Sequence, residues 1–275
     1  MWTFNSIFGK IFDLIFLPFR NMNPWVGMII VSLLTSLFML FVFRFTSNQK
    51  GIKTVKNRIK AYLLEIRLFK DNLGQSLKAQ GGILKQNARY IGYSGKPMLV
   101  MIVPLILILI QLNFWFGYEP FKPSKPAILK VKLKEGFLPT ETQIDLKTPP
   151  GVVIESPALR IDEEREVNWR FSTDQPGIHE LGITIGGETV LKRINARPRK
   201  LQKISPIKPH NNFLDQLFYP AEPPIPESLP LESITITQPE YRFNLFGLRM
   251  HWIIVYFALS IVFGFALKGL FGVEI

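Results

Sequence analysis

The residue types that most often carry out catalysis are few in this chain and are scattered along it. The 275 residues include three histidines and no cysteine, so cysteine nucleophiles, zinc-thiolate sites and iron-sulfur clusters are excluded. His179, His210 and His251 lie too far apart in sequence to suggest a metal-ligand set. The motifs of serine hydrolases, zinc proteases, dinucleotide-binding folds and phosphate loops are also missing. We therefore expect a protein without enzymatic activity, cofactor or bound metal.

The chemistry that the sequence does offer is hydrogen bonding inside apolar segments. A few polar side chains lie in or beside these segments, and polar side chains need hydrogen-bond partners or water when hydrocarbon surrounds them. One interpretation is that they line a hydrophilic groove for a substrate, and the alternative is routine helix packing. For Arg44, at the end of its apolar segment, the alternative is that its side chain reaches the lipid headgroups. The six candidate groove residues are Ser32, Thr35, Ser36, Arg44, Gln111 and Asn113.

Three uncharged segments must position these polar groups. The composition is 47% hydrophobic and the mean hydropathy is +0.17, which is unusual for a water-soluble domain. Residues 25–43 and 98–117 contain no charge and are long enough to cross about 30 Å of hydrocarbon as helices. A third uncharged run covers residues 252–267. The pattern predicts an α-helical membrane protein with spans at 25–45, 98–117 and 251–269.

Basic residues are concentrated in one connection between the spans. The net charge of the whole chain is +12, of which residues 46–97 carry +9, whereas residues 118–250 carry only +1. Positively charged loops remain in the cytoplasm. The pattern predicts that residues 46–97 and the tail at 270–275 are cytoplasmic, and that the amino terminus and residues 118–250 are outside.

The segment before the first span has the pattern of an amphipathic helix. Within residues 1–24, apolar side chains recur every three or four residues from Phe4 to Phe19, and the opposite side carries polar residues such as Lys10 and Asp13. Such a helix is expected to lie in the membrane interface on the external side. The alternative is a helix packed against another subunit.

Residues 46–97 predict a basic helical hairpin of coiled-coil type. One apolar seam follows a regular three- and four-residue spacing, and a second set (Leu77, Leu84, Ala88 and Ile91) continues at compatible spacing. The tip of the hairpin falls either near Gly74 or near Gly81-Gly82. The hairpin is expected to offer a basic contact face, or merely to carry solvated charges that fix the topology. The seam consists of Ile52, Val55, Ile59, Tyr62, Ile66, Phe69 and Leu73, and the basic residues are Lys53, Lys56, Lys60, Arg67, Lys70, Lys78, Lys85 and Arg89.

The external connection predicts a β domain followed by a tether. Seven short runs rich in strand-forming residues alternate with turn signals between Ala127 and Ala196, and Gly186-Gly187 fits a hairpin turn. Residues 118–197 are therefore interpreted as an all-β sandwich of immunoglobulin-like type, with Trp169 in its core. Residues 198–250 are rich in proline and are expected to form an extended tether with one short helix at 212–218.

The order of these parts resembles the core of the YidC/Oxa/Alb insertase superfamily. The similarity is to its three-span branch, which includes the third subunit of the endoplasmic reticulum membrane protein complex and archaeal relatives. The stretch from Asn244 to Arg249 looks like the N-x-F-G-L-R stretch before the third span of that subunit, and Pro104 is similar to an early proline in the second span. The resemblance covers residues 1–117 and 241–275. It does not cover the β domain.

The resemblance implies an insertase or membrane chaperone that helps hydrophobic segments to enter the bilayer. It also implies that the hairpin receives the client segment and that a groove between the spans lowers the cost of moving its polar flank. In bacterial insertases this groove carries a positive charge within the membrane, whereas Arg44 lies at the membrane edge. The expected partners are the lipid bilayer, nascent membrane proteins and the ribosome or acidic cytoplasmic factors, but no specific nucleic acid sequence.

A second hypothesis is a structural anchor subunit that docks a protein partner through its external β domain. Because the external part has no cysteine and no Asn-x-Ser/Thr sequence, we expect a bacterial inner membrane with the β domain in the periplasm.

Overall fold

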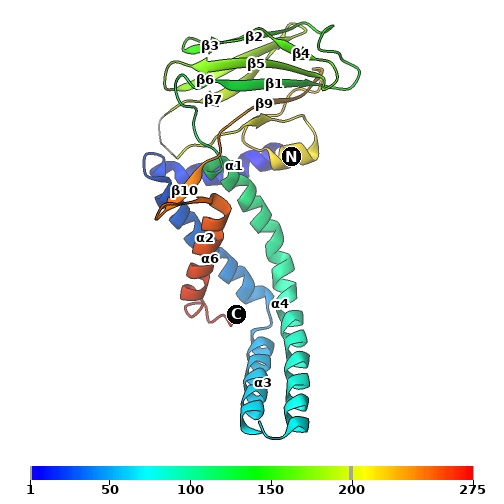
Figure 1. Ribbon diagram of the computed structural model, residues 1–275, viewed down its shortest axis with the longest axis vertical. Helices are drawn as coiled ribbons and strands as arrows, with labels where there is room; N and C mark the ends of the chain where they lie inside the picture. Colours follow the sequence, from blue (N-terminus) through cyan, green and yellow to red (C-terminus); the bar gives the residue numbers. More distant parts are fainter. Residues whose placement is uncertain (1, 198–200, 275) are drawn as a thin grey trace. The chain divides into compact units, whose positions relative to one another are not determined.

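The structure of the protein is a computed structural model that describes residues 2–197 and 201–274. The chain forms two compact units, and each is assembled from two separate stretches of sequence. We call them the helical unit, Met28–Ile108 with Ile253–Ile275, and the β unit, Met1–Gly27 with Leu109–Trp252. Figure 1 labels their elements along the chain.

Four helices contribute to the helical unit. They are α2 (Pro24–Thr46), α3 (Gln49–Leu68), α4 (Leu73–Phe116) and α6 (Trp252–Leu267). By length and composition, α2 and α4 are apolar enough to cross a membrane, whereas α6 has 16 residues and falls short of that length. The expected spans at 25–45 and 98–117 thus coincide with α2 and with the second half of α4.

The second expected span is not a separate helix. Helix α4 is continuous over 44 residues, from Leu73 to Phe116, and it passes through Pro97 and Pro104. A proline within a helix removes one backbone hydrogen bond and bends the helix without necessarily ending it. The hairpin and the apolar segment that follows it are therefore parts of a single helix.

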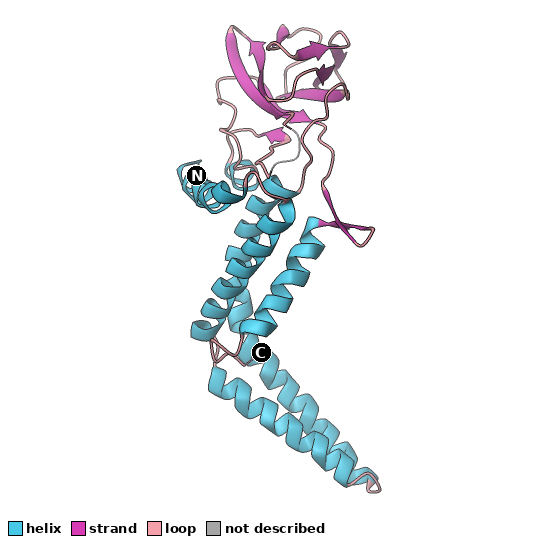
Figure 2. Ribbon diagram, turned by 90° about the vertical axis from the view of Figure 1, so that its left-hand side faces the viewer, coloured by secondary structure: helices cyan, strands magenta, loops and turns pink. Residues whose placement is uncertain are grey.

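Helices α3 and α4 form the expected antiparallel hairpin, and they lie side by side in both views (Figures 1 and 2). Helix α3 begins after Asn48, whose side-chain oxygen accepts a hydrogen bond from the Gly51 amide at 2.9 Å. The connection covers residues 69–72, so the tip lies beside Gly74. Gly81-Gly82 lies inside α4, which rules out the other expected position for the tip.

The β unit contains two antiparallel sheets and a separate hairpin of two strands. All seven strands expected between Ala127 and Ala196 are present. They are β1 (Ala127–Leu133), β2 (Ile144–Lys147), β3 (Val152–Ile154), β4 (Leu159–Ile161), β5 (Glu166–Thr173), β6 (Ile178–Ile185) and β7 (Glu188–Asn195). The turn between β6 and β7 is Gly186-Gly187 with φ of 57° and 86°, the left-handed conformation that favours glycine.

The two sheets enclose one hydrophobic core. The larger sheet has the order β3-β5-β1-β9-β8, with β4 paired to β5, and the smaller has the order β2-β6-β7. Trp169 and Phe171 on β5 are buried together with Leu181 and Ile183 on β6. The strong alternation of buried and exposed residues along β1 follows the two-residue period of a strand with one face in a core. Trp169 thus occupies the expected core position.

The expectation that residues 198–250 form an extended tether is wrong for most of the described part. Strand β9 (Leu231–Ile236) lies between β1 and β8 (Ile207–Lys208) in the larger sheet. Leu231, Ile234 and Ile236 are buried in the common core. Ile234 and Ile236 keep the two-residue period of a strand, whereas Leu231 lies beyond a shift in the pairing with β1. The β domain therefore extends well beyond its expected end at residue 197.

Three further elements follow or precede these strands. The short helix expected at 212–218 is α5 (Phe213–Phe218), capped by the Asn212 side chain. Strands β10 (Arg242–Leu245) and β11 (Leu248–His251) form the separate hairpin. Helix α1 (Trp2–Phe16) continues into one turn of 3₁₀ helix, η1 (Leu17–Phe19).

The apolar side chains of α1 divide into a buried and an exposed group. Phe12 and Phe16 are buried, whereas Ile7, Ile11 and Leu14 are exposed. The Phe16 ring lies 4.6 Å from that of Trp115 at the end of α4. The expected apolar stripe is therefore real, but part of it packs within the β unit.

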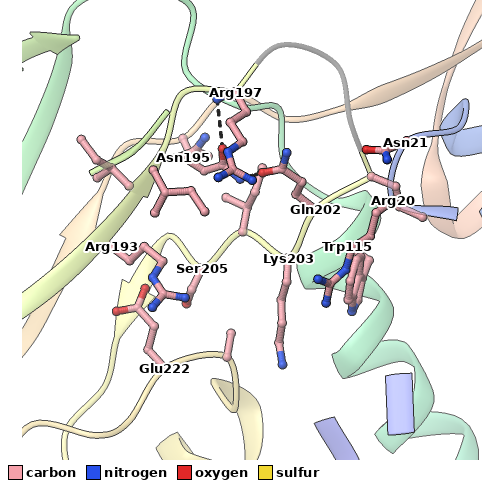
Figure 3. A pocket seen from close by; sticks show the side chains of 16 residues that line it. Arg20, Asn21, Trp115, Arg193, Asn195, Arg197, Gln202, Lys203, Ser205 and Glu222 are labelled. Carbon is pink, nitrogen blue, oxygen red and sulfur yellow. Dashed lines mark hydrogen bonds between the residues drawn. The ribbon is translucent and has the colours of Figure 1, made fainter. Parts of the chain in front are cut away.

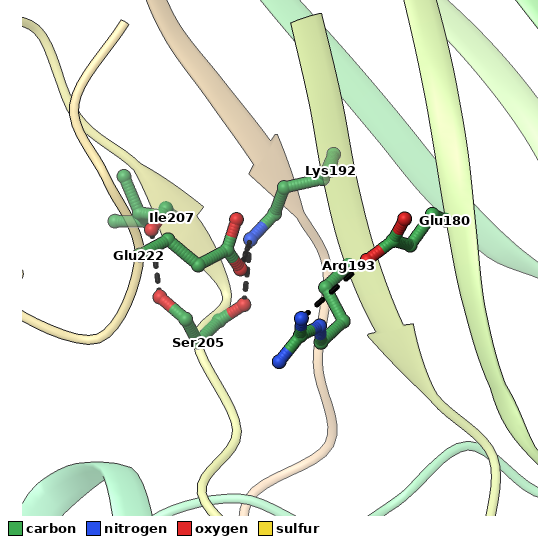
Figure 4. Close-up of polar contacts among 6 residues, drawn as sticks. All are labelled: Glu180, Lys192, Arg193, Ser205, Ile207 and Glu222. Carbon is green, nitrogen blue, oxygen red and sulfur yellow. Dashed lines mark hydrogen bonds and ion pairs between the residues drawn. The ribbon is translucent and has the colours of Figure 1, made fainter.

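A buried ion pair ties β7 to the segment that follows α5 (Figure 4). Lys192 is fully buried, and its Nζ lies 2.6 Å from Glu222 Oε1 and 2.8 Å from the Ser205 carbonyl oxygen. Burial lowers the pKa of Lys192, and the neighbouring Glu222 carboxylate opposes that effect. Both charges are removed from water, so each depends on the other.

We predict that Glu222→Gln destabilises the β unit by about 3 kcal/mol, because it leaves the Lys192 charge buried without its counter-ion. The measurement is chemical unfolding of the detergent-solubilised chain, followed by near-ultraviolet circular dichroism of the tryptophans. Glu180→Gln is the matched control, since Glu180 pairs with Arg193 at 3.4 Å on the exposed surface and should cost less than about 1 kcal/mol. Equal losses in the two variants would contradict the assignment.

Candidate functional site

A cluster of buried hydroxyl groups joins α2 and α6 within the helical unit. Ser32, Thr35 and Ser36 on α2 are all buried. The Ser36 hydroxyl shares its hydrogen bond between two backbone carbonyl oxygens, that of Ser32 at 2.7 Å and that of Ser260 on α6 at 2.9 Å. Because hydrocarbon cannot hydrogen-bond, this contact between helices is a favourable way to satisfy a buried hydroxyl.

Several oxygens in this cluster retain unused hydrogen-bonding capacity. The Tyr256 hydroxyl lies close to the side chains of Thr35 and Ser260. Among the described residues, no partner bonds Ser32 Oγ, Tyr256 Oη or Ser260 Oγ, although all three atoms are buried. Buried polar atoms normally find partners. The cluster can therefore donate to or accept from a polar group that approaches it.

Of the six candidate groove residues, four lie in the helical unit and two in the β unit. Ser32, Thr35 and Ser36 come together, but Arg44 is exposed in the last turn of α2, about 12 Å along the helix from Ser36 at 1.5 Å per residue. Gln111 and Asn113 belong to the β unit. Within the helical unit, the candidate groove residues that lie together are thus the three hydroxyl residues of α2.

Tyr256 is the member of the hydroxyl cluster that the sequence analysis does not include. It is fully buried in α6 and lies one helical turn before Ser260, so both side chains lie on the same side of the helix. A tyrosine and a serine spaced by four residues in an otherwise apolar helix were the signal available in the sequence.

The apolar seam of the hairpin is buried at its base and exposed at its tip. Ile52 and Val55 are buried, whereas Phe69 and Leu73 are 44% and 78% exposed. The remaining seam residues, Ile59, Tyr62 and Ile66, are half-buried. The burial of the seam residues thus decreases along α3, from its start toward the turn, and Leu73 is the first residue of α4.

The side of α4 that packs against α3 differs from the one expected. Leu77, Leu84, Ala88 and Ile91 are all exposed, so the prediction that they continue the seam is wrong. Instead, α4 approaches α3 through Gly82, where an added Cβ would lie 2.6 Å from the Tyr62 ring. Ala79 and Gln86, three residues before and four residues after Gly82, are buried on the same side.

Because small residues make this contact, the large apolar residues of α4 form an exposed row. Leu77, Leu84 and Ile91 are 58%, 71% and 68% exposed and recur every seven residues. Lys78, Lys85 and Arg89, separated by seven and four residues, lie beside them on the helix. The apolar row and the basic row together make a surface that suits an apolar segment with acidic flanks.

The eight candidate basic residues lie on or near the surface of the hairpin. Lys56 is half-buried, and the other seven are exposed. Among the described residues, none of those seven has a carboxylate oxygen within 4.0 Å, whereas Lys56 Nζ lies 3.0 Å from Glu274 Oε2. Most of the positive charge on the hairpin is therefore available to a partner.

The last described residues pack against the base of the hairpin. Val273 is buried with Leu40, Phe43 and Ile52, and the Glu274 amide donates a hydrogen bond to Gln49 Oε1 at 2.7 Å. Hydrogen bonding and attraction to Lys56 lower the pKa of the Glu274 carboxyl below its ordinary value of 4.5. The described residues of the tail predicted at 270–275 are thus docked against the helical unit.

The described residues contain no group of three or more His, Cys, Asp or Glu side chains that could hold a metal ion. Comparisons with protein-family models, curated proteins and solved structures found no match to this chain. The functional argument therefore depends on the geometry of the hairpin and of the hydroxyl cluster.

We predict that Gly82→Val destabilises the hairpin by about 1–3 kcal/mol, because the new side chain meets the Tyr62 ring. The measurement is hydrogen exchange of the α3 amides, which should become faster. Gly81→Val is the matched control: it carries the same loss of glycine within the same helix, but nothing lies within 4 Å of its added Cβ. Similar exchange rates in the two variants would contradict the close contact at Gly82.

The docking of the tail should depend on pH. Because the pKa of Glu274 is lowered in the folded protein, its contribution is present above the ordinary pKa and is lost as the pH falls through the lowered value. A spin label on Leu270→Cys, in a chain without other cysteines, should become more mobile over this range. With Glu274→Gln added, the label should be mobile at every pH. If neither the fall in pH nor Glu274→Gln changes the mobility of the label, the ion pair does not hold the tail.

Proposed function

We propose that this protein is a membrane insertase or membrane chaperone that helps hydrophobic segments of other proteins to enter the bilayer. The observation that carries this proposal is the exposed row of Leu77, Leu84 and Ile91 on α4, next to a row of basic residues. Exposed apolar rows of this kind commonly mark interaction surfaces. The proposed clients are newly made membrane proteins, whose apolar segments would cover the row.

The continuity of α4 supports the transfer of a client from the hairpin to the membrane. The exposed row begins close to the tip, and the same helix continues through the apolar half that contains Pro104. A client that follows this helix would pass from a basic, water-exposed surface to an uncharged one. No energy source is required for this step, because burial of the client's apolar surface is favourable by itself.

In this proposal the hydroxyl cluster lowers the free-energy cost of moving the polar residues next to the client's apolar segment into the bilayer. Ser32, Tyr256 and Ser260 have buried oxygens with unused hydrogen-bonding capacity, and an unpaired polar group costs several kcal/mol in hydrocarbon. The mechanism uses hydroxyl groups in place of a buried positive charge, because Arg44 is exposed.

The proposed topology places the hairpin in the cytoplasm, the amino terminus outside and α6 as a third span. The +9 charge of residues 46–97 supports it. The β domain is proposed to have an immunoglobulin-like fold and to lie in the periplasm of a bacterium with the chain in its inner membrane. This arrangement and the resemblance to the three-span branch of the YidC/Oxa/Alb superfamily support one another.

Site-specific photocrosslinking in living cells tests the function. A photoreactive amino acid at Leu84 or Thr35 should give short-lived adducts with many newly made membrane proteins, as followed by pulse-chase labelling. Asn57 is the matched control, because it is an exposed polar residue of the same hairpin and should give few such adducts. Replacing Leu77, Leu84 and Ile91 together by glutamine should also reduce the adducts formed from Thr35.

One stable adduct that persists through the chase would refute the insertase proposal. It would favour the second candidate function, a structural anchor subunit with a fixed partner. That alternative requires the stable adduct to form from the β domain, for example from exposed Leu159 on β4. Crosslinking from Leu159 and from Leu84 in parallel therefore distinguishes the two functions.

A further inference from the structure

A cavity of about 250 Å³ lies within the β unit (Figure 3). Its wall combines the turn after η1, the end of α4, the end of β7 and the segment that contains Gln202 and Lys203. These parts are far apart in sequence, and no motif connects them. The volume suits a small polar group better than an extended organic ligand.

The side chains around this cavity are mainly basic. Arg20, Arg193, Arg197 and Lys203 line it, and Glu222 is the one acidic residue among the lining residues that the structure describes. Glu222 is already engaged, since its carboxylate bonds the fully buried Lys192 at 2.6 Å. The cavity therefore has an excess of positive charge.

Two of the arginines have no counter-ion in the described part of the chain. No carboxylate oxygen there lies within 4.0 Å of the Arg20 or Arg197 guanidinium, whereas Arg193 pairs with Glu180 at 3.4 Å. A guanidinium presents its donors in a planar fork that matches two oxygens of a carboxylate or phosphate. Both side chains can thus accept an anionic ligand without breaking an existing ion pair.

Two buried donors add to this pattern. Trp115 is 4% exposed, and its Nε1 has no hydrogen-bond acceptor among the described residues. An indole N–H can only donate, so its missing partner must be an acceptor. Lys203 is largely buried, and burial lowers its pKa, while Asp13 at 3.9 Å opposes this only in part. A negatively charged acceptor would satisfy both groups.

We propose that this cavity binds the phosphate group of a phosphate monoester or diester. Four basic side chains and the Trp115 side chain line the space, and two of the four, Arg20 and Arg197, have no counter-ion in the described part of the chain. Phosphate offers acceptor oxygens to donors in several directions. The ligand is either the headgroup of an anionic phospholipid or a soluble phosphate ester. Trp115 follows directly on the apolar part of α4, and tryptophans at such positions lie at the level of lipid headgroups, which favours the lipid.

Native mass spectrometry of the full chain in a neutral detergent tests this proposal. The probes are dioctanoyl phosphatidylglycerol, which is an anionic lipid, and glycerol 3-phosphate, which is a soluble ester with similar chemistry. Each is titrated against the wild type and against the double variant Arg20→Gln, Arg197→Gln. At least one probe should bind the wild type, and the double variant should weaken its binding by about tenfold or more, because charged hydrogen bonds are lost.

The double variant Lys125→Gln, Lys147→Gln is the matched control. It removes the same charge from exposed positions of the β unit that do not line the cavity, and it should bind like the wild type. Trp115→Phe keeps an aromatic side chain but removes the N–H donor, and it should weaken binding while the chain remains folded at the temperature of the measurement. Phosphatidylglycerol binding alone identifies the lipid headgroup as the ligand, and binding of glycerol 3-phosphate identifies a soluble ester.

Two results would overturn the proposal. The first is that neither probe binds the wild type. The second is that the two double variants weaken binding equally, since the effect would then come from net charge and not from the cavity. The thermal unfolding of all variants is measured in parallel, so that loss of binding through unfolding is recognised.

Discussion

Contacts among aromatic rings hold together the parts of the β unit that lie next to the apolar helices. The centroid of the Phe243 ring on β10 lies 4.9 Å from that of Trp25, at the start of α2, and 5.9 Å from that of Phe116, at the end of α4. Phe16 of α1 packs on both Trp115 and Phe116. Each such pair contributes about 0.5–1.5 kcal/mol beyond the burial of its area. These contacts hold the end of α1 against the end of α4, where Trp115 lines the cavity.

The fold was predictable wherever a single periodic pattern dominated the sequence. The seven strands, the Gly186-Gly187 turn and the helical hairpin all follow from regular spacing of apolar residues or from turn residues. Strand β9 was missed because prolines on both sides of it suggested an extended chain, although Ile234 and Ile236 alternate with polar residues as in a strand. Local composition was thus a poorer guide than side-chain alternation.

The candidate site was harder to predict, because its geometry depends on which side of each helix is buried. Leu84 seemed suited to the seam by its type, but a glycine at position 82 allows α3 and α4 to approach so closely that small residues fill the contact. The hydroxyl cluster was hard to predict for a related reason, because it depends on which helices meet. Tyr256 is separated by more than two hundred residues from Ser36, and no sequence spacing could show that the two helices meet.

The helical unit is interrupted in sequence by the β unit, and this has a consequence for the order in which the protein can fold during its synthesis. The bond between Ser36 and Ser260 joins residues 224 positions apart, and that between Lys56 and Glu274 joins residues 218 apart. A ribosome must therefore complete the whole β unit before α2 can meet α6. Until then, the polar side of α2 and the base of the hairpin remain uncovered. Other factors in the cell would have to protect these surfaces during translation.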